Sequence, residues 1–289
     1  MTTFKFGIIA NTGKESVKDV LPGFLRWLDS EGISFILASD FSKLMDITKW
    51  KSAPPLEIAD HCEFVLSFGG DGTFLQTARV VAPRETPIIG INLGGFGYLA
   101  EVAPEQMKTA VKQVLKGEYS LEERMMLGVR HEKAAPEDQC YCLNDVVIDR
   151  GSVTRTIKLE TCISGRYLNT FHADGLIIST PTGSTGYSLS TGGPILEPNL
   201  DSMVVCPICP HMLANRPLVV AGDKIIEVKT FSHEGAYQVS VDGRSVLKPS
   251  SCEKVIIQKA PFVTRLVVFL DRDFYAVLRN KLHWRDQMM

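Results

Sequence analysis

FVLSFGGDGTFLQTARVVA, residues 64–82, joins an apolar run to a helical pattern through the turn Gly69-Gly70-Asp71-Gly72. Glycines in such a turn let the backbone approach a ligand closely, and the start of a helix favours anions. No lysine follows as in a Walker P-loop, and no Gly-x-Gly-x-x-Gly is present at this point. Asp71 therefore either accepts a proton or helps hold Mg²⁺ beside a phosphate, or it caps the following helix.

Apolar runs and helical patterns alternate around this turn over the first 120 residues. Strands that alternate with helices indicate an α/β domain with a mostly parallel sheet. Pro22 argues against a single unbroken helix at 15–31. The predicted elements are strands at 4–10, 33–39, 64–68 and 86–94, and helices at 15–31, 73–82 and 104–116.

The sequence changes character after about residue 120. Short runs rich in Val, Ile and Thr follow one another, separated by Gly, Asp, Asn and Pro turns. Because no helical pattern comes between them, they predict a β-rich second domain at 121–270 after the N-terminal domain at 1–120. The remaining tail, 271–289, contains DFYAVLRNKLHW (273–284), whose pattern fits a strand or a helix.

Composition excludes several classes of protein. Of the 289 residues, 45% are hydrophobic, which is enough for a full core. Lys and Arg number 31 against 33 Asp and Glu, so the net charge of −2 argues against a dedicated nucleic-acid binder. We find neither an apolar stretch long enough to span a membrane nor a signal-peptide pattern at the start. We expect a cytoplasmic protein whose seven cysteines are reduced.

Two further segments carry polar side chains suited to a ligand. FHADGLIISTPTGSTGYSLSTGGP (171–194) offers backbone and hydroxyl donors for phosphate or sugar hydroxyls, or it is a plain Gly/Ser loop at a strand end. In CLNDVVIDRG (142–151), Asn144 can pair with an amide-bearing ring and Asp145 with ribose hydroxyls or a metal. The alternative for this pair is an ordinary β-turn.

CPICPH (206–211) contains a Cys-x2-Cys pair, Cys206 and Cys209, followed by His211. A structural zinc site needs four ligands, and Cys140 and Cys142 are too closely spaced to supply the second pair. Packing of buried thiols is the preferred interpretation, and we assign no metal site to the chain.

Together these segments resemble the NAD kinases, which phosphorylate the adenosine ribose 2′-hydroxyl of NAD to give NADP. The matching stretches are GGDGT (69–73), the Asn-Asp pair (144–145), DGLIISTPTGSTGYSLSTGGP (174–194), PICPH (207–211) and VDG (241–243). They follow the family's order, and the block within 174–194 is its most specific part. The resemblance implies a Rossmann-like N-terminal domain that binds nucleotide, a β-sandwich-like C-terminal domain, and a tail that returns to the first.

The resemblance also implies roles for individual residues. Asp71 would be the general base beside NAD, ATP the donor, NAD the acceptor and Mg²⁺ the expected divalent cation. Asn144 and Asp145 would contact the dinucleotide in a site that bridges subunits of a homodimer or homotetramer, and Asp174, with His172, would hold its nicotinamide end. The other implied contacts are Gly69, Gly70, Gly72 and Thr73 for phosphate, and Gly72, Arg155, Thr185, Gly186, Tyr187, Ser188, Leu189, Ser190 and Arg244 for NAD.

The chain departs from the family pattern at three positions. The family usually has Glu where this chain has Asp145, which shortens the reach of the carboxylate by about 1.5 Å. It usually has Ala at the position of Gly186, and often Gln at that of Arg244, whose guanidinium can pair with a phosphate. These departures affect affinity and geometry but leave the catalytic carboxylate in place.

Two other functions remain open. A diacylglycerol- or sphingosine-type lipid kinase shares the glycine–aspartate turn but would need an apolar acceptor groove. A non-catalytic NAD(P) sensor would keep the fold without turnover. The pattern does not distinguish ATP from polyphosphate as the donor.

Overall fold

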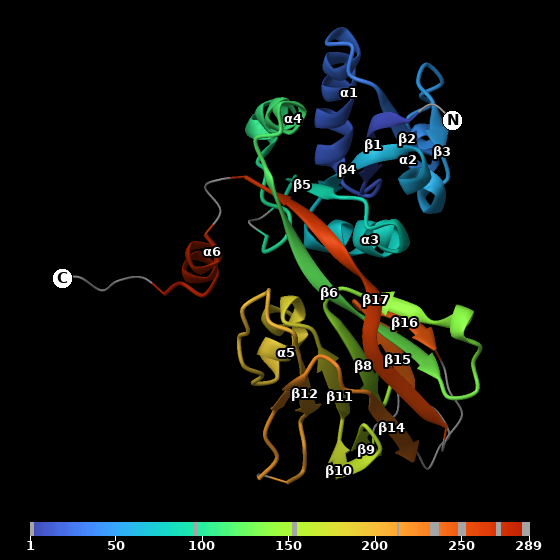
Figure 1. Ribbon diagram of the computed structural model, residues 1–289, viewed down its shortest axis with the longest axis vertical. Coiled ribbons are helices and arrows are strands. Elements are labelled where there is room, and N and C mark those ends of the chain that lie inside the picture. The colour runs from blue at the N-terminus through green and yellow to red at the C-terminus, as the bar shows by residue number, and fades with distance from the viewer. Residues whose placement is uncertain are drawn as a thin grey trace, which may run out of the picture. The chain divides into compact units, whose positions relative to one another are not determined.

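A computed structural model describes residues 3–94, 97–151, 155–212, 214–231, 237–247, 253–269 and 273–284 (Figure 1). The chain forms two compact units. The first comprises residues 1–123 and 264–289, and the second comprises residues 124–263. Strands β6 (Ser120–His131) and β17 (Lys254–Val268) each contribute residues to both units.

The first unit is built on a parallel sheet in the order β17-β5-β4-β1-β2-β3. Its other strands are β1 (Phe4–Ala10), β2 (Phe35–Ala38), β3 (Ser52–Ala53), β4 (Cys62–Gly69) and β5 (Ile88–Asn92). The four predicted strands are confirmed, with bounds that differ by a few residues. Because β2 and β4 flank β1 on opposite sides, the chain order reverses between β1 and β4.

Helices cover both faces of this sheet. The helices of this unit are α1 (Glu15–Ser30), α2 (Ser39–Leu44), α3 (Asp71–Val81), α4 (Met107–Lys116) and α6 (Phe274–Lys281), of which α1 and α4 pack on one face and α3 on the other, with short 3-10 turns η1 (Pro55–Asp60), η2 (Ala82–Arg84) and η3 (Pro104–Gln106). Residues of α1 and α4 share a core with alternate residues of β1, β2, β4 and β5. On the other face, Ser67 of β4 hydrogen-bonds Thr77 of α3.

Helix α1 runs unbroken through Pro22, as the helical pattern at 15–31 predicts and although a proline inside a helix disfavours it. Its buried stripe comprises Val17, Leu21, Phe24, Leu25 and Leu28. Packing of this stripe outweighs the one hydrogen bond that a proline inside a helix removes. The sequence patterns also did not predict the short elements α2 and β3.

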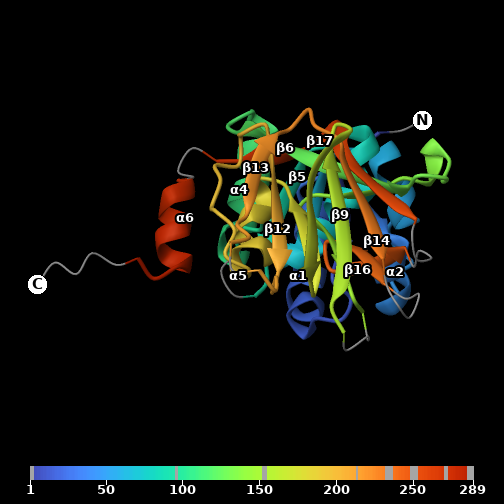
Figure 2. The same cartoon turned by 90° about the horizontal axis from the view of Figure 1, so that it is seen from below.

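The second unit consists of two antiparallel sheets. One has the order β13-β12-β11-β8-β15-β16, and the other has the order β10-β9-β14-β17, with β6 beside β17 and β7 beside β6. In Figure 2 the paired strands β9 and β14 run side by side. Residues of both sheets share one apolar core, which makes the unit a sandwich and confirms the predicted fold class.

The strands of this unit are short apart from β6 and β17. They are β7 (Cys140–Cys142), β8 (Asp145–Asp149), β9 (Ile157–Ile163), β10 (Arg166–Ala173), β11 (Gly175–Ser179), β12 (Ser202–Ile208), β13 (Leu218–Ala221), β14 (Ile226–Phe231), β15 (Gln238–Val241) and β16 (Arg244–Leu247). Its helical turns are η4 (Pro136–Asp138), η5 (Thr182–Thr185) and α5 (Tyr187–Ser190).

The ambiguous segment near the C-terminus is helical. Asp273 caps α6, because its Oδ1 accepts a hydrogen bond from the Tyr275 N–H at 2.9 Å. The Lys281 Nζ of this helix lies 5.4 Å from the ring centre of Tyr98, within the same unit. Among the described residues, no helix is both long and apolar enough to cross a membrane.

Candidate functional site

The turn at 69–72 connects β4 to α3, and its glycines Gly69 and Gly72 have different surroundings. A Cβ built on Gly69 would lie 2.1 Å from the Thr73 Oγ1, so this glycine makes room for a side chain that is itself buried. A Cβ on Gly72 would meet nothing within 4 Å. The predicted phosphate contacts Gly69 and Thr73 therefore pack against each other, whereas Gly72 faces open space.

Asp71 is the first residue of α3, and Gly70 occupies the cap position before it. The Asp71 carboxylate accepts hydrogen bonds from the backbone N–H groups of Tyr98, Leu99 and Ala100, at 2.8, 3.0 and 3.2 Å. The helix-cap alternative is therefore wrong. A side chain on Gly97 would collide with this carboxylate, since its Cβ would lie 2.3 Å from Asp71 Oδ1. The loop 97–100 thus holds the carboxylate in one orientation.

Sequence reasoning missed two partners of this turn. One is the loop 97–100, whose signal was the glycine-rich GGFG (94–97) at the end of the predicted strand at 86–94. The other is Lys14, from NTGK (11–14) after the first strand. A Cβ built on Gly94 would lie 2.8 Å from Lys14 Nζ, and one on Gly70 would lie 3.5 Å from it. Carboxyl ends of neighbouring parallel strands meet at one sheet edge, where such loops come together.

In the second unit, Asp242 fixes the backbone around Asn144 and Asp145. Its carboxylate accepts from the N–H groups of Leu143, Asn144 and Asp145, at 3.2, 2.8 and 3.4 Å. The Asn144 Oδ1 is buried and has no hydrogen-bond partner among the described residues. An unpaired buried amide oxygen is costly, so this atom is suited to a donor on a ligand.

Asp145 is only 5% exposed. Burial, reinforced by the negative charge of Asp242, raises the pKa of the Asp145 carboxyl from 3.8 to about 7. Near neutral pH its carboxyl can therefore both donate and accept hydrogen bonds to ribose hydroxyls.

The loop formed by η5 and α5 packs directly on Asn144. A Cβ on Gly183 would lie 2.1 Å from the Asn144 carbonyl oxygen, so only glycine permits this approach. A Cβ on Gly186 would lie 3.4 Å from Asn144 Nδ2 and 3.7 Å from Asp145 Oδ2. The alanine that is usual in the family would fit at Gly186 with small shifts.

The predicted ligand residues of this loop differ in accessibility. Tyr187 and Ser190 are exposed, and Thr185, Gly186 and Leu189 are partly exposed. Burial, with smaller contributions from Asp149, Cys209, Asp174 and Asp145, raises the pKa of the Tyr187 hydroxyl. Ser188 is fully buried, so its side chain has no surface to offer a ligand as the loop stands.

The remaining predicted site residues are exposed or partly exposed. Asp174 forms an ion pair with Arg150, 3.0 Å from its Nε. Arg155, His172 and Arg244 are exposed. Cys206 is buried and its Sγ lies 3.1 Å from Thr191 Oγ1, whereas Cys209 is exposed. The described residues contain no group of three His, Cys, Asp or Glu side chains arranged to hold a metal.

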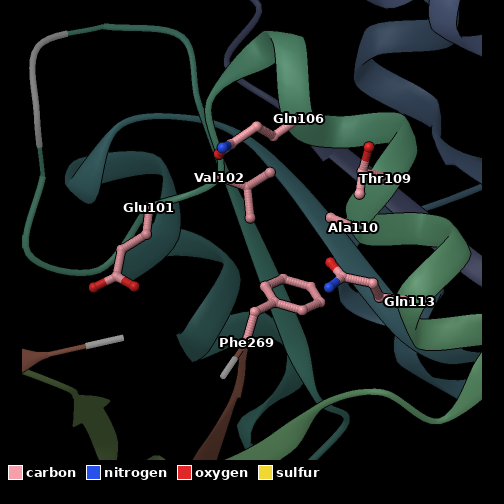
Figure 3. Close-up of a pocket in the computed structure, with 7 residues that line it drawn as sticks. All are labelled: Glu101, Val102, Gln106, Thr109, Ala110, Gln113 and Phe269. Atoms are coloured by element: carbon pink, nitrogen blue, oxygen red, sulfur yellow. The ribbon is translucent and has the colours of Figure 1, made fainter. Parts of the chain in front are cut away.

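A cavity of about 320 Å³ lies beside α4 in the first unit (Figure 3). Thr109 and Gln113 of this helix face it, together with Gln106 at the end of η3 and Phe269 from the segment after β17. None of the predicted site residues lines this cavity.

The two halves of the chain match two family models in order. Residues 6–119 match the ATP-NAD kinase N-terminal domain, and residues 143–269 match the ATP-NAD kinase C-terminal domain. The chain is 41% identical over 284 residues to the NAD kinase of Geotalea daltonii, covering 98% of this chain and 99% of that one.

The chain belongs to the NAD kinase family. A second relative, the NAD kinase of Citrifermentans bemidjiense, is also 41% identical, over 286 residues that cover 98% of this chain and 99% of the relative. The resemblance to NAD kinases is therefore confirmed, and the activity is that of a phosphotransferase with an alcohol group as acceptor. Family membership selects this activity over the lipid-kinase alternative.

Solved structures agree with the fold. An NAD kinase from Archaeoglobus fulgidus in complex with ATP superposes with a TM-score of 0.76 at 25% identity, covering 97% of this chain and 99% of that one. Yeast NADH kinase complexed with NADH gives a TM-score of 0.89 at 21% identity, covering 100% of this chain and 90% of that one.

Proposed function

We propose that this NAD kinase phosphorylates the adenosine ribose 2′-hydroxyl of NAD from ATP, with Asp71 as the general base. The observation that carries the assignment is the carboxylate of Asp71, oriented by three backbone N–H groups beside the open space at Gly72. A carboxylate has about four lone-pair sites, so one remains for the hydroxyl proton. Phosphoryl transfer depends mainly on positioning and on neutralising charge, so such a fixed base suits the reaction.

We infer that the second unit supplies the dinucleotide contacts. The unpaired Asn144 Oδ1 would accept from an amide-bearing ring, and Asp145 would meet ribose hydroxyls. Tyr187 and Thr185 would line the loop beside them, whereas Ser188 would act through its backbone. Asp174, which is ion-paired with Arg150, would contact the nicotinamide end of the dinucleotide.

Mg²⁺ would enter as part of the Mg·ATP substrate. The described part of the chain offers no carboxylate cage, and Mg²⁺ usually keeps several waters while it binds substrate phosphates. We further propose a cytoplasmic homodimer or homotetramer. Free thiols at Cys62, Cys140, Cys142, Cys162, Cys206 and Cys209 support a reducing compartment.

The deciding experiment is an assay for NADP formed from NAD with Mg²⁺ and either ATP or polyphosphate. Wild-type protein should form NADP, and Asp71→Asn should lower kcat by about 100-fold or more, since removal of a general base typically costs that much. Binding of NAD, followed by calorimetry, should change little. A wild-type protein that binds NAD but forms no NADP with either donor would instead favour the sensor alternative.

The substitution Asp71→Asn also changes the contacts of the loop 97–100, because an amide nitrogen cannot accept from the N–H groups at 98–100. Loss of stability of about 1 kcal/mol is expected from this change. Lys18→Met is a suitable control for handling and purity, since Lys18 is ion-paired with Glu15 on the surface of α1. If Asp71→Asn keeps near wild-type kcat, the base assignment is wrong.

A further inference from the structure

The ammonium group of Lys14 lies beside the glycine turn that holds Asp71. Cβ atoms built on Gly94 and Gly70 would lie 2.8 and 3.5 Å from its Nζ, so both glycines leave room for this cation. Lys14 follows β1, Gly70 follows β4, and Gly94 follows β5. These three strands are parallel neighbours, and the chain order reverses between β1 and β4. Ligands of open α/β sheets bind at this kind of position.

The loop that carries Lys14 is firmly held. The Asn11 N–H donates to the Phe68 carbonyl at 3.0 Å, and the Asn11 Oδ1 accepts from the Gly13 N–H at 2.9 Å. The Lys14 N–H then donates to the Asn11 carbonyl at 3.1 Å. Ser16, two residues further on, donates to the Leu93 carbonyl at 3.1 Å. The backbone from which the Lys14 side chain projects is therefore held by contacts to β4 and to Leu93, which follows β5.

Lys14 is half-buried, yet no carboxylate of the described residues lies within ion-pair distance of its Nζ. Its nearest acid in sequence, Glu15, pairs with Lys18 instead, at 3.1 Å. Asp71 is occupied by the N–H groups of Tyr98, Leu99 and Ala100. A partly desolvated cation without an anionic partner, set among backbone glycines, is suited to an anionic ligand.

We propose that Lys14 is a catalytic residue that binds the phosphoryl group being transferred. This inference rests on the proposed function, in which Asp71 faces the acceptor hydroxyl. Because the γ-phosphoryl group must meet that hydroxyl, a cation beside Gly70 reaches its oxygens. The cation that a phosphate loop usually carries in its own sequence is supplied here by the loop after β1.

Transfer of the γ-phosphoryl group forms one bond to phosphorus and breaks one. The 2′-hydroxyl oxygen of NAD forms a bond to the γ-phosphorus of ATP, and its proton passes to the Asp71 carboxylate. The bond from the γ-phosphorus to the β–γ bridging oxygen breaks, and ADP leaves with the electron pair. Lys14 offsets negative charge on the transferred group and breaks no bond itself.

The test compares Lys14→Met, which keeps length and removes charge, with Lys14→Arg and with the control Lys18→Met. For Lys14→Met we expect kcat/KM for ATP to fall by about 100-fold, as for removal of one fixed charge donor. KM for NAD should stay within about twofold, and Lys14→Arg should recover part of the loss. Lys18→Met should match the wild type in both quantities.

Binding gives a second, activity-independent measurement. In calorimetry, Lys14→Met should weaken Mg·ATP by about tenfold but Mg·ADP by less than about twofold, because ADP lacks the γ-phosphoryl group. Gly94→Ala tests the same contact without altering Lys14. Its Cβ would displace the ammonium, which ends a flexible side chain, so the fold should survive while kcat/KM for ATP falls.

The outcomes separate the two proposals. NADP formation by the wild type tests the proposed function alone. Equal kcat/KM for ATP in the wild type and Lys14→Met, or equal losses of ATP and ADP affinity, would overturn the role of Lys14. If Lys14→Met does not fold, wild-type activity in soluble Gly94→Ala would overturn it in the same way.

Discussion

At the scale of single residues, Asp71 and Asp145 are two carboxyl groups in opposite environments. Asp71 is partly exposed and receives three backbone N–H groups within the first unit. Asp145 is buried in the second unit near the charge of Asp242, and its pKa is raised to about 7. The two chemically identical groups therefore differ in what surrounds them. The first suits a fixed proton acceptor, and the second suits a hydrogen-bonding group that exchanges its proton near neutrality.

The raised pKa of Asp145 predicts how stability depends on pH. The folded state keeps a proton that the unfolded chain loses above about pH 4, so this contribution is complete below that pH and is lost as pH rises through about 7. Between pH 5 and pH 8 the loss should be about 2–3 kcal/mol. Asp145→Asn carries no such charge and should lack this part of the pH dependence.

Urea unfolding at pH 5 and pH 8 measures this difference. From pH 5 to pH 8, the free energy of unfolding of the wild type should fall by about 2–3 kcal/mol more than that of Asp145→Asn. Asp223→Asn is the control, because Asp223 is a surface carboxylate paired with the adjacent Lys224. Identical pH dependence in the wild type and Asp145→Asn would show that Asp145 ionises in the folded state as it does in the unfolded chain.

At the scale of elements, the loop of η5 and α5 is placed by a glycine that the sequence did not single out. Gly183 lets the loop backbone lie against Asn144, and Gly186 sits three residues further along with more space. Both Ser184 and Ser188 are buried beneath the loop. The loop of η5 and α5 thus packs against Asn144 and Asp145, and its Tyr187 is exposed to solvent.

The pair Gly183→Ala and Gly186→Ala tests this arrangement. At Gly183 the added methyl group would meet backbone atoms at 2.1 to 2.7 Å, which cannot move without shifting the loop. Gly183→Ala should lower the free energy of unfolding by about 2–3 kcal/mol and weaken NAD binding. Gly186→Ala should fold normally and stay within about 1 kcal/mol of the wild type.

Thermal unfolding and NAD titration of both variants give the comparison. A Gly183→Ala protein as stable as Gly186→Ala would mean that the loop does not press on Asn144 as the backbone distances require. A destabilised Gly186→Ala would mean that the alanine common in the family cannot be accommodated by this chain.

At the scale of the whole molecule, the first unit is completed by the end of the chain. Leu266 of β17 pairs with Ile88 of β5, and Val267 belongs to the core of the first unit. The unit border at Thr264 therefore falls inside a strand, whereas the sequence predicted the end of the second domain at residue 270. Local patterns cannot place such a border, because one continuous apolar strand serves two cores.

This arrangement predicts unequal behaviour of fragments. Residues 1–123 alone lack the β17 end, which leaves β5 without its partner at Ile88 and opens the core at Val267. They should show no cooperative unfolding, whereas residues 124–263 retain both sheets of the second unit and should unfold cooperatively. Circular dichroism during urea titration of each fragment measures this. A sharp transition for residues 1–123 would show that the returning strand is dispensable.

Features that depend on local chemistry could be predicted before any coordinates were known. Apolar periodicity located the strands and helices of the first unit, closely spaced strands marked the β-rich second half, and residue order in GGDGT and STPTGSTGYSLSTGG identified the family. The partners of Asp71, the position of Lys14 and the contact of Gly183 with Asn144 emerged only from the folded chain. These contacts join segments tens of residues apart, and they depend on strand order, which local periodicity does not encode.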